Sequence, residues 1–236
     1  MTTRLGFLIP PANPTIEPEM SALAPQGVTV HFSRMVIQEG GGGLEGQEER
    51  NRTQLAHLDE TADLLIKVKP AVMMMAHAAM SYTLGRKGEA ELMARMEQKY
   101  ATRVSTAFAG VLAALEALGV KRVALGAPYA EGIMLKGKAL LEEHGFEVVS
   151  AAVLPHGGNI YDLNAGHAAE LARLIDRPEA DAIYLSGLGL PTIAVLERLE
   201  RGQGKPVISA ATAMMWHALR LAGVPARVPG YGRLLA

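Results

Sequence analysis

The stretch RLGFLIP at residues 4–10 returns as RVALGAP at residues 122–128, and this repetition decides the fold. Each copy is a short apolar run that ends at a proline, a pattern typical of a buried strand. Two further pairs of landmarks keep the same order along the chain: Val72 to His77 with Ala182 to Gly187, and Ser105 with Ser209. Matched landmarks at a near-constant offset indicate a duplicated structural unit.

The remaining apolar runs fit the same plan. Runs bounded by Gly or Pro predict strands at Leu5 to Ile9, Val28 to Ile37, Ala71 to Ala76, Val123 to Ala127, Val148 to Leu154, Ala182 to Leu185 and Val207 to Ser209. Helical patterns lie between them, at Glu49 to Val68, Glu89 to Tyr100, Phe108 to Leu118, Ile133 to Glu143, Ala165 to Ile175, Ile193 to Arg201 and Ala213 to Leu221. This alternation predicts an α/β fold with parallel sheets.

We therefore expect two similar Rossmann-like lobes related by a pseudo-two-fold axis. The first lobe comprises residues 1–106 together with 211–236, and the second comprises residues 107–210. Ligands of open α/β sheets bind beyond the carboxyl ends of the strands, so the site is expected in the cleft between the lobes. The segments expected to line it are Pro10 to Thr15, His77 to Ser81, Pro128 to Tyr129 and Gly187 to Thr192.

Composition excludes several classes of function. The 236 residues hold 23 Lys and Arg against 24 Asp and Glu, so no basic field is available to bind nucleic acid. No window has the ~20 apolar residues that a membrane span needs, and we expect a cytoplasmic protein. Cysteine is absent, which excludes disulfides, thiolate nucleophiles and Cys-ligated zinc. The histidines show no metal-ligand spacing, so we expect neither a metal nor a cofactor.

The glycine-rich stretch at residues 39–46 follows the second predicted strand. It lacks the lysine and hydroxyl residue of a phosphate-binding loop. Two interpretations stay open, a plain flexible loop and a flap that closes over the cleft.

The chain resembles the aspartate/glutamate racemase superfamily, on the branch that holds arylmalonate decarboxylase and maleate isomerase. The matching motifs run along nearly the whole sequence: LGFLIPPANPTIEPE at 5–19, SYTLG at 81–85, GVKRVALGAPY at 119–129, LSGLGLPTIAVLE at 185–197, KPVISA at 205–210, LRLAG at 219–223 and PGYGRL at 229–234. The resemblance implies catalytic groups at the end of the third strand of each lobe, where many relatives carry cysteines.

Those two catalytic positions fall on His77 and Gly187, so both thiols are missing here. Thiolate addition to a double bond and two-base racemisation both need these thiols in the family, so neither mechanism is available to this chain in that form. His77 is the titratable group that remains, and imidazole exchanges protons near neutral pH. From its surroundings alone, a histidine next to Met73, Met74, Met75 and Met80 is more often a hydrogen-bonded core residue, and the match to the family's catalytic position is what favours the functional interpretation.

The resemblance also implies groups that hold the substrate anion. Tyr129 is expected to donate a hydrogen bond as a second catalytic residue, unless it is a packing residue. The residues expected to contact substrate are Pro11, Asn13, Ala78, Ala79, Ser81, Gly187, Leu188, Gly189 and Asn159. Ala78 and Ala79 replace a hydroxyl pair of the decarboxylase, for which Ser81 is expected to compensate. The backbone N–H groups of Gly187 to Gly189 are expected at the start of a helix, where they could bind a carboxylate. For Asn13, a substrate contact and a helix N-cap are equally good interpretations.

Two more interpretations come from the residues around these positions. Glu17 and Glu19 are expected to complement the dipole of a helix at its first turn. The methionines near His77, together with Leu188, suggest a substrate less polar than aspartate, although a methionine run in a strand is more often core.

The leading hypothesis is a cofactor-independent enzyme that performs acid/base chemistry, a decarboxylation or an isomerisation, at a carbon next to a carboxylate of a small organic acid. The alternative is a non-catalytic protein that binds or senses small carboxylates. Hydrolase or lyase chemistry on an unrelated substrate is a third interpretation that the fold permits. The partner is then a small carboxylate, with no nucleic acid and no membrane, and the sequence leaves open whether the chain forms a homo-oligomer.

Overall fold

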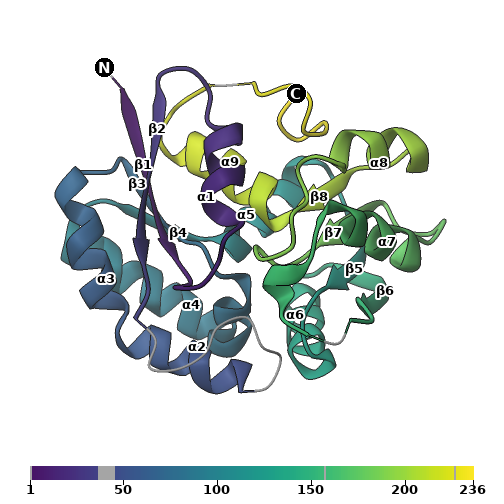
Figure 1. Cartoon of the computed structure of the whole chain (residues 1–236), viewed down its shortest axis with the longest axis horizontal. Coiled ribbons are helices and arrows are strands. Elements are labelled where there is room, and N and C mark those ends of the chain that lie inside the picture. Colours follow the sequence, from purple (N-terminus) through teal and green to yellow (C-terminus); the bar gives the residue numbers. More distant parts are fainter. Residues whose placement is uncertain (1, 37–45, 157, 226) are drawn as a thin grey trace.

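Two four-stranded parallel sheets with flanking helices form the protein (Figure 1). The computed structural model describes residues 2–36, 46–156, 158–225 and 227–236. The strand order is β2-β1-β3-β4 in the first sheet and β6-β5-β7-β8 in the second. The two orders are the same when each lobe is numbered from its first strand, as the duplication predicts. The expected α/β fold of two similar lobes is therefore confirmed.

The elements of the first half are β1 (Thr3–Ile9), α1 (Ile16–Leu23), β2 (Val28–Arg34), α2 (Gln47–Ala56), α3 (Leu58–Leu65), the 3-10 helix η1 (Ile66–Val68), β3 (Val72–Met75), α4 (Ala78–Tyr100) and β4 (Arg103–Thr106). The central strands β1 and β3 are buried on both faces. That explains why they read as continuous apolar runs rather than alternating ones.

The second half contains α5 (Ala107–Ala117), β5 (Arg122–Ala127), α6 (Glu131–Glu143), β6 (Glu147–Val153), the 3-10 helix η2 (Ile160–Asp162), α7 (Ala165–Ile175), β7 (Ala182–Leu185), α8 (Leu196–Gln203), β8 (Val207–Ser209) and α9 (Ala210–Leu221). Among the described residues, no helix has the length and apolar character needed to cross a membrane.

Three elements differ from the sequence prediction. The helix expected over Glu49 to Val68 is two α-helices and a 3-10 turn, because the chain leaves helical geometry at His57. The helix expected from Glu89 begins at Ala78 and bends at Gly85, where φ is 68°. Strand β4 was not predicted because Val104 is its one strongly apolar residue and no Gly or Pro bounds it.

Helices α5 and α9 pack against each other between the two sheets (Figure 1). A Cβ atom on Gly110 of α5 would lie 3.0 Å from the Ala213 carbonyl oxygen, so the glycine permits this close approach. Each helix begins at a hydroxyl cap, Thr106 for α5 and Ser209 for α9. The structural partner of Ser209 is therefore Thr106, one residue beyond the Ser105 that the sequence comparison paired with it. Helix α9 also contacts β3, β4 and α1 of the first half.

Hydrogen bonds from the segment between β1 and α1 hold the loop after β7. The Asn13 amide nitrogen donates to the Leu188 carbonyl at 3.2 Å, and the Thr15 hydroxyl donates to the Gly189 carbonyl at 3.2 Å. The Glu19 carboxylate accepts from the backbone N–H of Thr192 at 2.6 Å and of Ile193 at 3.1 Å. We call these contacts the inter-lobe seam.

Glu17 and Glu19 both lie in the first turn of α1 as expected, and the carboxyl group of Glu19 also accepts the hydrogen bonds of the seam. Its side chain is only 6% exposed. Burial raises the pKa of Glu19 from 4.5 to about 7, and the hydrogen bonds from Thr192 and Ile193 oppose that rise. Glu17 instead forms an ion pair with Arg34 at the surface.

The raised pKa of Glu19 predicts a pH-dependent stability. A folded-state pKa above the unfolded one favours folding at low pH, and this contribution is lost between about pH 4.5 and about pH 7. The slope reaches ~1.4 kcal/mol per pH unit. In Glu19→Gln this loss should be absent, as measured by urea unfolding at pH 5 and pH 8. Glu17→Gln is the matched control and should keep the wild-type slope. An equal slope in wild type and Glu19→Gln would contradict the assignment.

Candidate functional site

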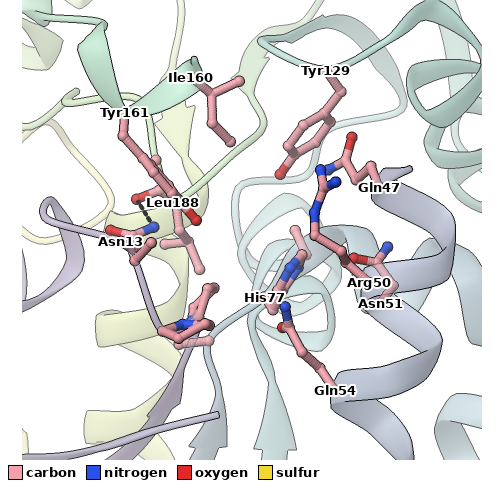
Figure 2. Close-up of a pocket in the computed structure, with 16 residues that line it drawn as sticks. Asn13, Gln47, Arg50, Asn51, Gln54, His77, Tyr129, Ile160, Tyr161 and Leu188 are labelled. Atoms are coloured by element: carbon pink, nitrogen blue, oxygen red, sulfur yellow. Dashed lines mark hydrogen bonds between the residues drawn. The ribbon is translucent and has the colours of Figure 1, made fainter. Parts of the chain in front are cut away.

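A pocket lies where the carboxyl ends of the strands of both lobes meet (Figure 2). The first lobe lines it with Pro10, Pro11, Ala12, Asn13, Gln47, Arg50, Asn51, Gln54, Ala76, His77 and Ala78, and the second with Tyr129, Ile160, Tyr161, Leu188 and Gly189. Arg50 is the one Lys, Arg, Asp or Glu among these described lining residues, and it contributes a positive charge to the pocket. Among the described residues, no group of three His, Asp or Glu side chains could hold a metal ion.

His77 lies at the junction of β3 and α4. It caps α4 in an extended conformation, with φ −153° and ψ 90°, and its side chain lines the pocket. Burial lowers the pKa of His77 from 6.5 to about 4, and the positive charge of Arg50 adds to this lowering. The imidazole is therefore neutral at physiological pH, ready to accept a proton rather than to donate one.

Tyr129 follows β5 and lines the same pocket from the second lobe, facing His77 across it (Figure 2). Burial raises the pKa of the Tyr129 phenol above its usual value of 10, and a hydrogen bond with the Ser186 hydroxyl opposes the rise. The phenol therefore keeps its proton at neutral pH and can act as a hydrogen-bond donor.

A buried hydroxyl cluster supports Tyr129 from behind. The Tyr82 hydroxyl of α4 lies 2.8 Å from the Ser186 hydroxyl, and the Tyr184 hydroxyl of β7 donates to Ser186 at 3.3 Å. The rings of Tyr82 and Tyr129 meet edge to face, with centroids 6.4 Å apart. Since Tyr82 comes from the first lobe and Ser186 from the second, this cluster fixes the Tyr129 side of the pocket across the lobes.

Gly187 occupies a position where no side chain fits. Its φ is +96°, in the region that favours glycine. A Cβ atom there would lie 2.7 Å from Cγ of Pro128 and 3.3 Å from the Tyr129 hydroxyl. The space that a thiol at this position would enter is thus taken by Pro128 and Tyr129.

Asn13 has the capping role that the sequence left open, and it also lines the pocket. Its side-chain oxygen accepts from the backbone N–H of Thr15 at 2.8 Å and of Ile16 at 3.0 Å, which caps α1. Its amide nitrogen belongs to the seam through Leu188. That nitrogen carries two hydrogens, so it can bind Leu188 and a ligand at the same time.

The structure brings seven of the expected residues together in the pocket lining: Pro11, Asn13, His77, Ala78, Tyr129, Leu188 and Gly189. The other four, Ala79, Ser81, Gly187 and Asn159, are not in the lining. The Ser81 side chain is fully buried, which separates its hydroxyl from the pocket. Asn159 caps η2, where its side-chain oxygen accepts from the Tyr161 N–H at 2.9 Å.

The turn at residues 187–189 does not begin a helix, contrary to expectation. Helix α8 begins at Leu196, and the Leu190 N–H closes a turn onto the Gly187 carbonyl at 3.3 Å. Pro191 lacks an N–H and disfavours helical geometry in the residue before it, which delays the helix. The backbone N–H groups at the following turn, those of Thr192 and Ile193, are occupied by Glu19.

Sequence reasoning missed the polar face of α2, which consists of Gln47, Arg50, Asn51 and Gln54. These residues recur at positions i, i+3, i+4 and i+7 and therefore share one face of the helix. That spacing was visible in the sequence, but a polar helical face usually lies in solvent. The glycine-rich stretch at residues 39–46, for which a flap was one interpretation, lies outside the described residues except for Gly46.

The methionines do not line the pocket. Met73, Met74, Met75 and Met80 are at most 1% exposed and pack in the core. The inference that they make the site apolar is therefore wrong. A strand buried on both faces places its side chains in the core, and the pocket begins only beyond its end.

The tight position of Gly187 predicts an unstable Gly187→Ala variant. A side chain at this φ costs ~1–3 kcal/mol of strain, and the contact with Pro128 adds to it. Gly132→Ala is the control, because that glycine lies in α6 with no atom near its absent Cβ. Urea unfolding should show a loss for Gly187→Ala and no loss for Gly132→Ala. Equal stabilities would refute the crowding at Gly187.

Comparison with known proteins identifies similar sequences along nearly the whole chain. The family model described as arylmalonate decarboxylase matches residues 5–235. The maleate isomerase of Nocardia farcinica is 32% identical, over 98% of this chain and 95% of its own length. The arylmalonate decarboxylase of Bordetella bronchiseptica is 30% identical, over 99% of this chain and 96% of its own length.

Solved structures agree over the whole chain. A variant of the Nocardia farcinica maleate cis-trans isomerase, with a covalently bound succinylcysteine intermediate, superimposes with a TM-score of 0.90 at 25% identity and covers 100% of this chain and 98% of its own. A crystal structure of arylmalonate decarboxylase gives a TM-score of 0.83 at 27% identity, covering 98% of each chain. Because this family model spans nearly the whole sequence and a relative of that name is 30% identical over 99% of it, the chain belongs to the arylmalonate decarboxylase family.

Proposed function

We propose that this protein is a cofactor-independent enzyme that moves a proton at a carbon next to a carboxylate of a small organic acid. A decarboxylation and an isomerisation both fall in this class. The observation that carries the proposal is the neutral imidazole of His77, which lines the pocket opposite the Tyr129 hydroxyl with Arg50 beside it. The family of the chain supports the same chemistry.

His77 acts as the proton carrier in this proposal. As a neutral imidazole it accepts the proton when a C–H bond breaks, and the electron pair passes to the adjacent carboxylate. In a decarboxylation the C–C bond breaks instead, carbon dioxide leaves, and a protonated His77 supplies the proton to carbon. A carboxylate bound beside the ring favours the imidazolium, so it raises the pKa of His77 from about 4 toward the neutral range.

Tyr129, Asn13 and Arg50 hold the anion. Tyr129 and Asn13 donate neutral hydrogen bonds from opposite lobes, and Arg50 supplies a positive charge. Donors that are already fixed before the ligand binds stabilise developing charge most effectively, because they need no reorganisation. The seam and the hydroxyl cluster supply that rigidity for Asn13 and Tyr129.

Removing the imidazole should abolish proton transfer without unfolding the protein. His77→Ala should slow solvent-deuterium exchange at the carbon next to the carboxylate by at least ~10²-fold, the usual effect of a general acid/base residue. NMR on malonates, maleate and amino acids measures this exchange. His57→Gln, at a histidine on the surface, is the control. An unchanged rate in His77→Ala would eliminate His77 as the proton carrier.

The lowered pKa of His77 also predicts the pH dependence. The base form is present above about pH 4, so kcat/KM should rise through that pH and stay level to neutral pH. A rise centred near pH 6.5 would show instead that the imidazole is not buried in the free enzyme.

A second candidate is a protein that binds small carboxylates without turnover. The crowding at Gly187 favours it, because the second catalytic position of the relatives has no room for a side chain. Ligand binding alone raises the melting temperature. A melting-temperature rise with any of these acids, without deuterium exchange in any of them, would support binding alone and contradict the enzyme.

A further inference from the structure

The polar face of α2 carries two buried amide side chains whose oxygens lack partners. Gln47 is 8% exposed and Gln54 is 4% exposed, and both line the pocket. Among the described residues, neither amide oxygen has a hydrogen-bond partner. A buried polar atom without a partner is costly to leave unsatisfied. These two amides therefore call for a hydrogen-bonding group in the pocket.

Helix α2 is held in place by contacts outside the pocket. The Asn51 amide nitrogen donates to the Ala79 carbonyl at 3.2 Å and to the Thr83 hydroxyl at 3.1 Å, which ties α2 to α4. Glu48 forms an ion pair with Lys136 of α6 in the other lobe. Asn51 and Glu48 thus tie α2 to one helix of each lobe, and this fixes the backbone that carries Gln47, Arg50 and Gln54.

Figure 2 shows which parts of the pocket these side chains face. Arg50 and Gln47 extend from α2 toward the side where Tyr129 lies, and Gln54 extends toward His77. Burial lowers the pKa of His77 and the positive charge of Arg50 adds to that lowering, while for Tyr161 burial raises the pKa and Arg50 opposes the rise. A ligand placed between His77 and Tyr129 therefore has a cation and two amides along one flank.

We propose that the polar face of α2 is a specificity wall that selects small carboxylates bearing a hydroxyl group. This inference rests on the proposed function and names the substrate class of the same site. An amide presents one acceptor and one donor group, and a hydroxyl both donates and accepts, so it satisfies either orientation of Gln47 or Gln54. Arg50 binds a carboxylate of the same ligand. An aryl or alkyl group on this flank would leave both amides unpaired.

The test compares hydroxymalonate with methylmalonate and phenylmalonate. The first two have the same charge and nearly the same size and differ in a hydroxyl against a methyl group. Isothermal titration calorimetry on wild type should give hydroxymalonate a Kd about tenfold lower than that of methylmalonate, the effect of one or two neutral hydrogen bonds. Phenylmalonate should bind more weakly than hydroxymalonate.

Variants locate the preference on α2. In the double variant Gln47→Met, Gln54→Met the ratio of the two Kd values should fall to about one, because methionine keeps the length and removes both polar atoms. Gln98→Met, at an exposed glutamine of α4, should keep the wild-type ratio. Arg50→Met should weaken both ligands about tenfold or more and leave their ratio in place.

Three outcomes would overturn the specificity wall: a ratio of one or below in wild type, a wild-type ratio retained in the double variant, or no binding of any of the three acids at millimolar concentration. Binding does not require turnover. If His77→Ala kept its exchange rate while the hydroxyl preference depended on Gln47 and Gln54, the proposed function would fail and the specificity wall would stand.

Discussion

The inter-lobe seam is the constraint on which the rest of the site depends. Each lobe is a sheet with its own helices, and both lobes contribute residues to the lining of the pocket that contains His77 and Tyr129. Asn13, Thr15 and Glu19 of the first lobe bind backbone groups of the loop after β7 in the second. One hydrogen bond contributes a net ~0.5–1.5 kcal/mol to stability, but several hydrogen bonds to one short loop together fix its position. The Tyr129 side of the pocket is thereby set relative to His77.

The electrostatics of the pocket suit a ligand that brings its own negative charge. His77 is neutral, the Tyr129 phenol keeps its proton, and Arg50 is the charged lining residue. Glu19, the nearest carboxyl of the seam, is occupied by backbone N–H groups and has a raised pKa. Among the described lining residues none is acidic and able to compete with an anion, and the charge of a bound anion makes His77 a stronger base.

Crowding at Gly187 gives the two faces of the pocket different chemistry. One face offers an imidazole, and the other offers the Tyr129 hydroxyl in the space where a side chain at residue 187 would begin. A proton can therefore be taken from one face, while the opposite face supplies a neutral donor. Such a site is suited to single-base chemistry rather than to two-base racemisation.

The sequence predicted the duplication, the parallel sheets and the strand ends that carry His77 and Tyr129, because strands buried on both faces leave clear apolar runs. It did not predict the polar face of α2, since amides and arginine on a helix normally indicate a solvated face. Nor did it predict the seam role of Glu19 or the crowding around Gly187. Both depend on contacts between residues more than fifty positions apart in the sequence, which local sequence patterns do not reveal.

The most direct test of this account is an NMR titration of the His77 ring nitrogens, with the signals assigned through His77→Gln. In the free protein the pKa of His77 should lie near 4, and saturating hydroxymalonate should raise it, because the bound carboxylate stabilises the imidazolium. A pKa near 6.5 that does not change when the acid is added would show that His77 neither faces the anion nor lies in the enclosed pocket described above.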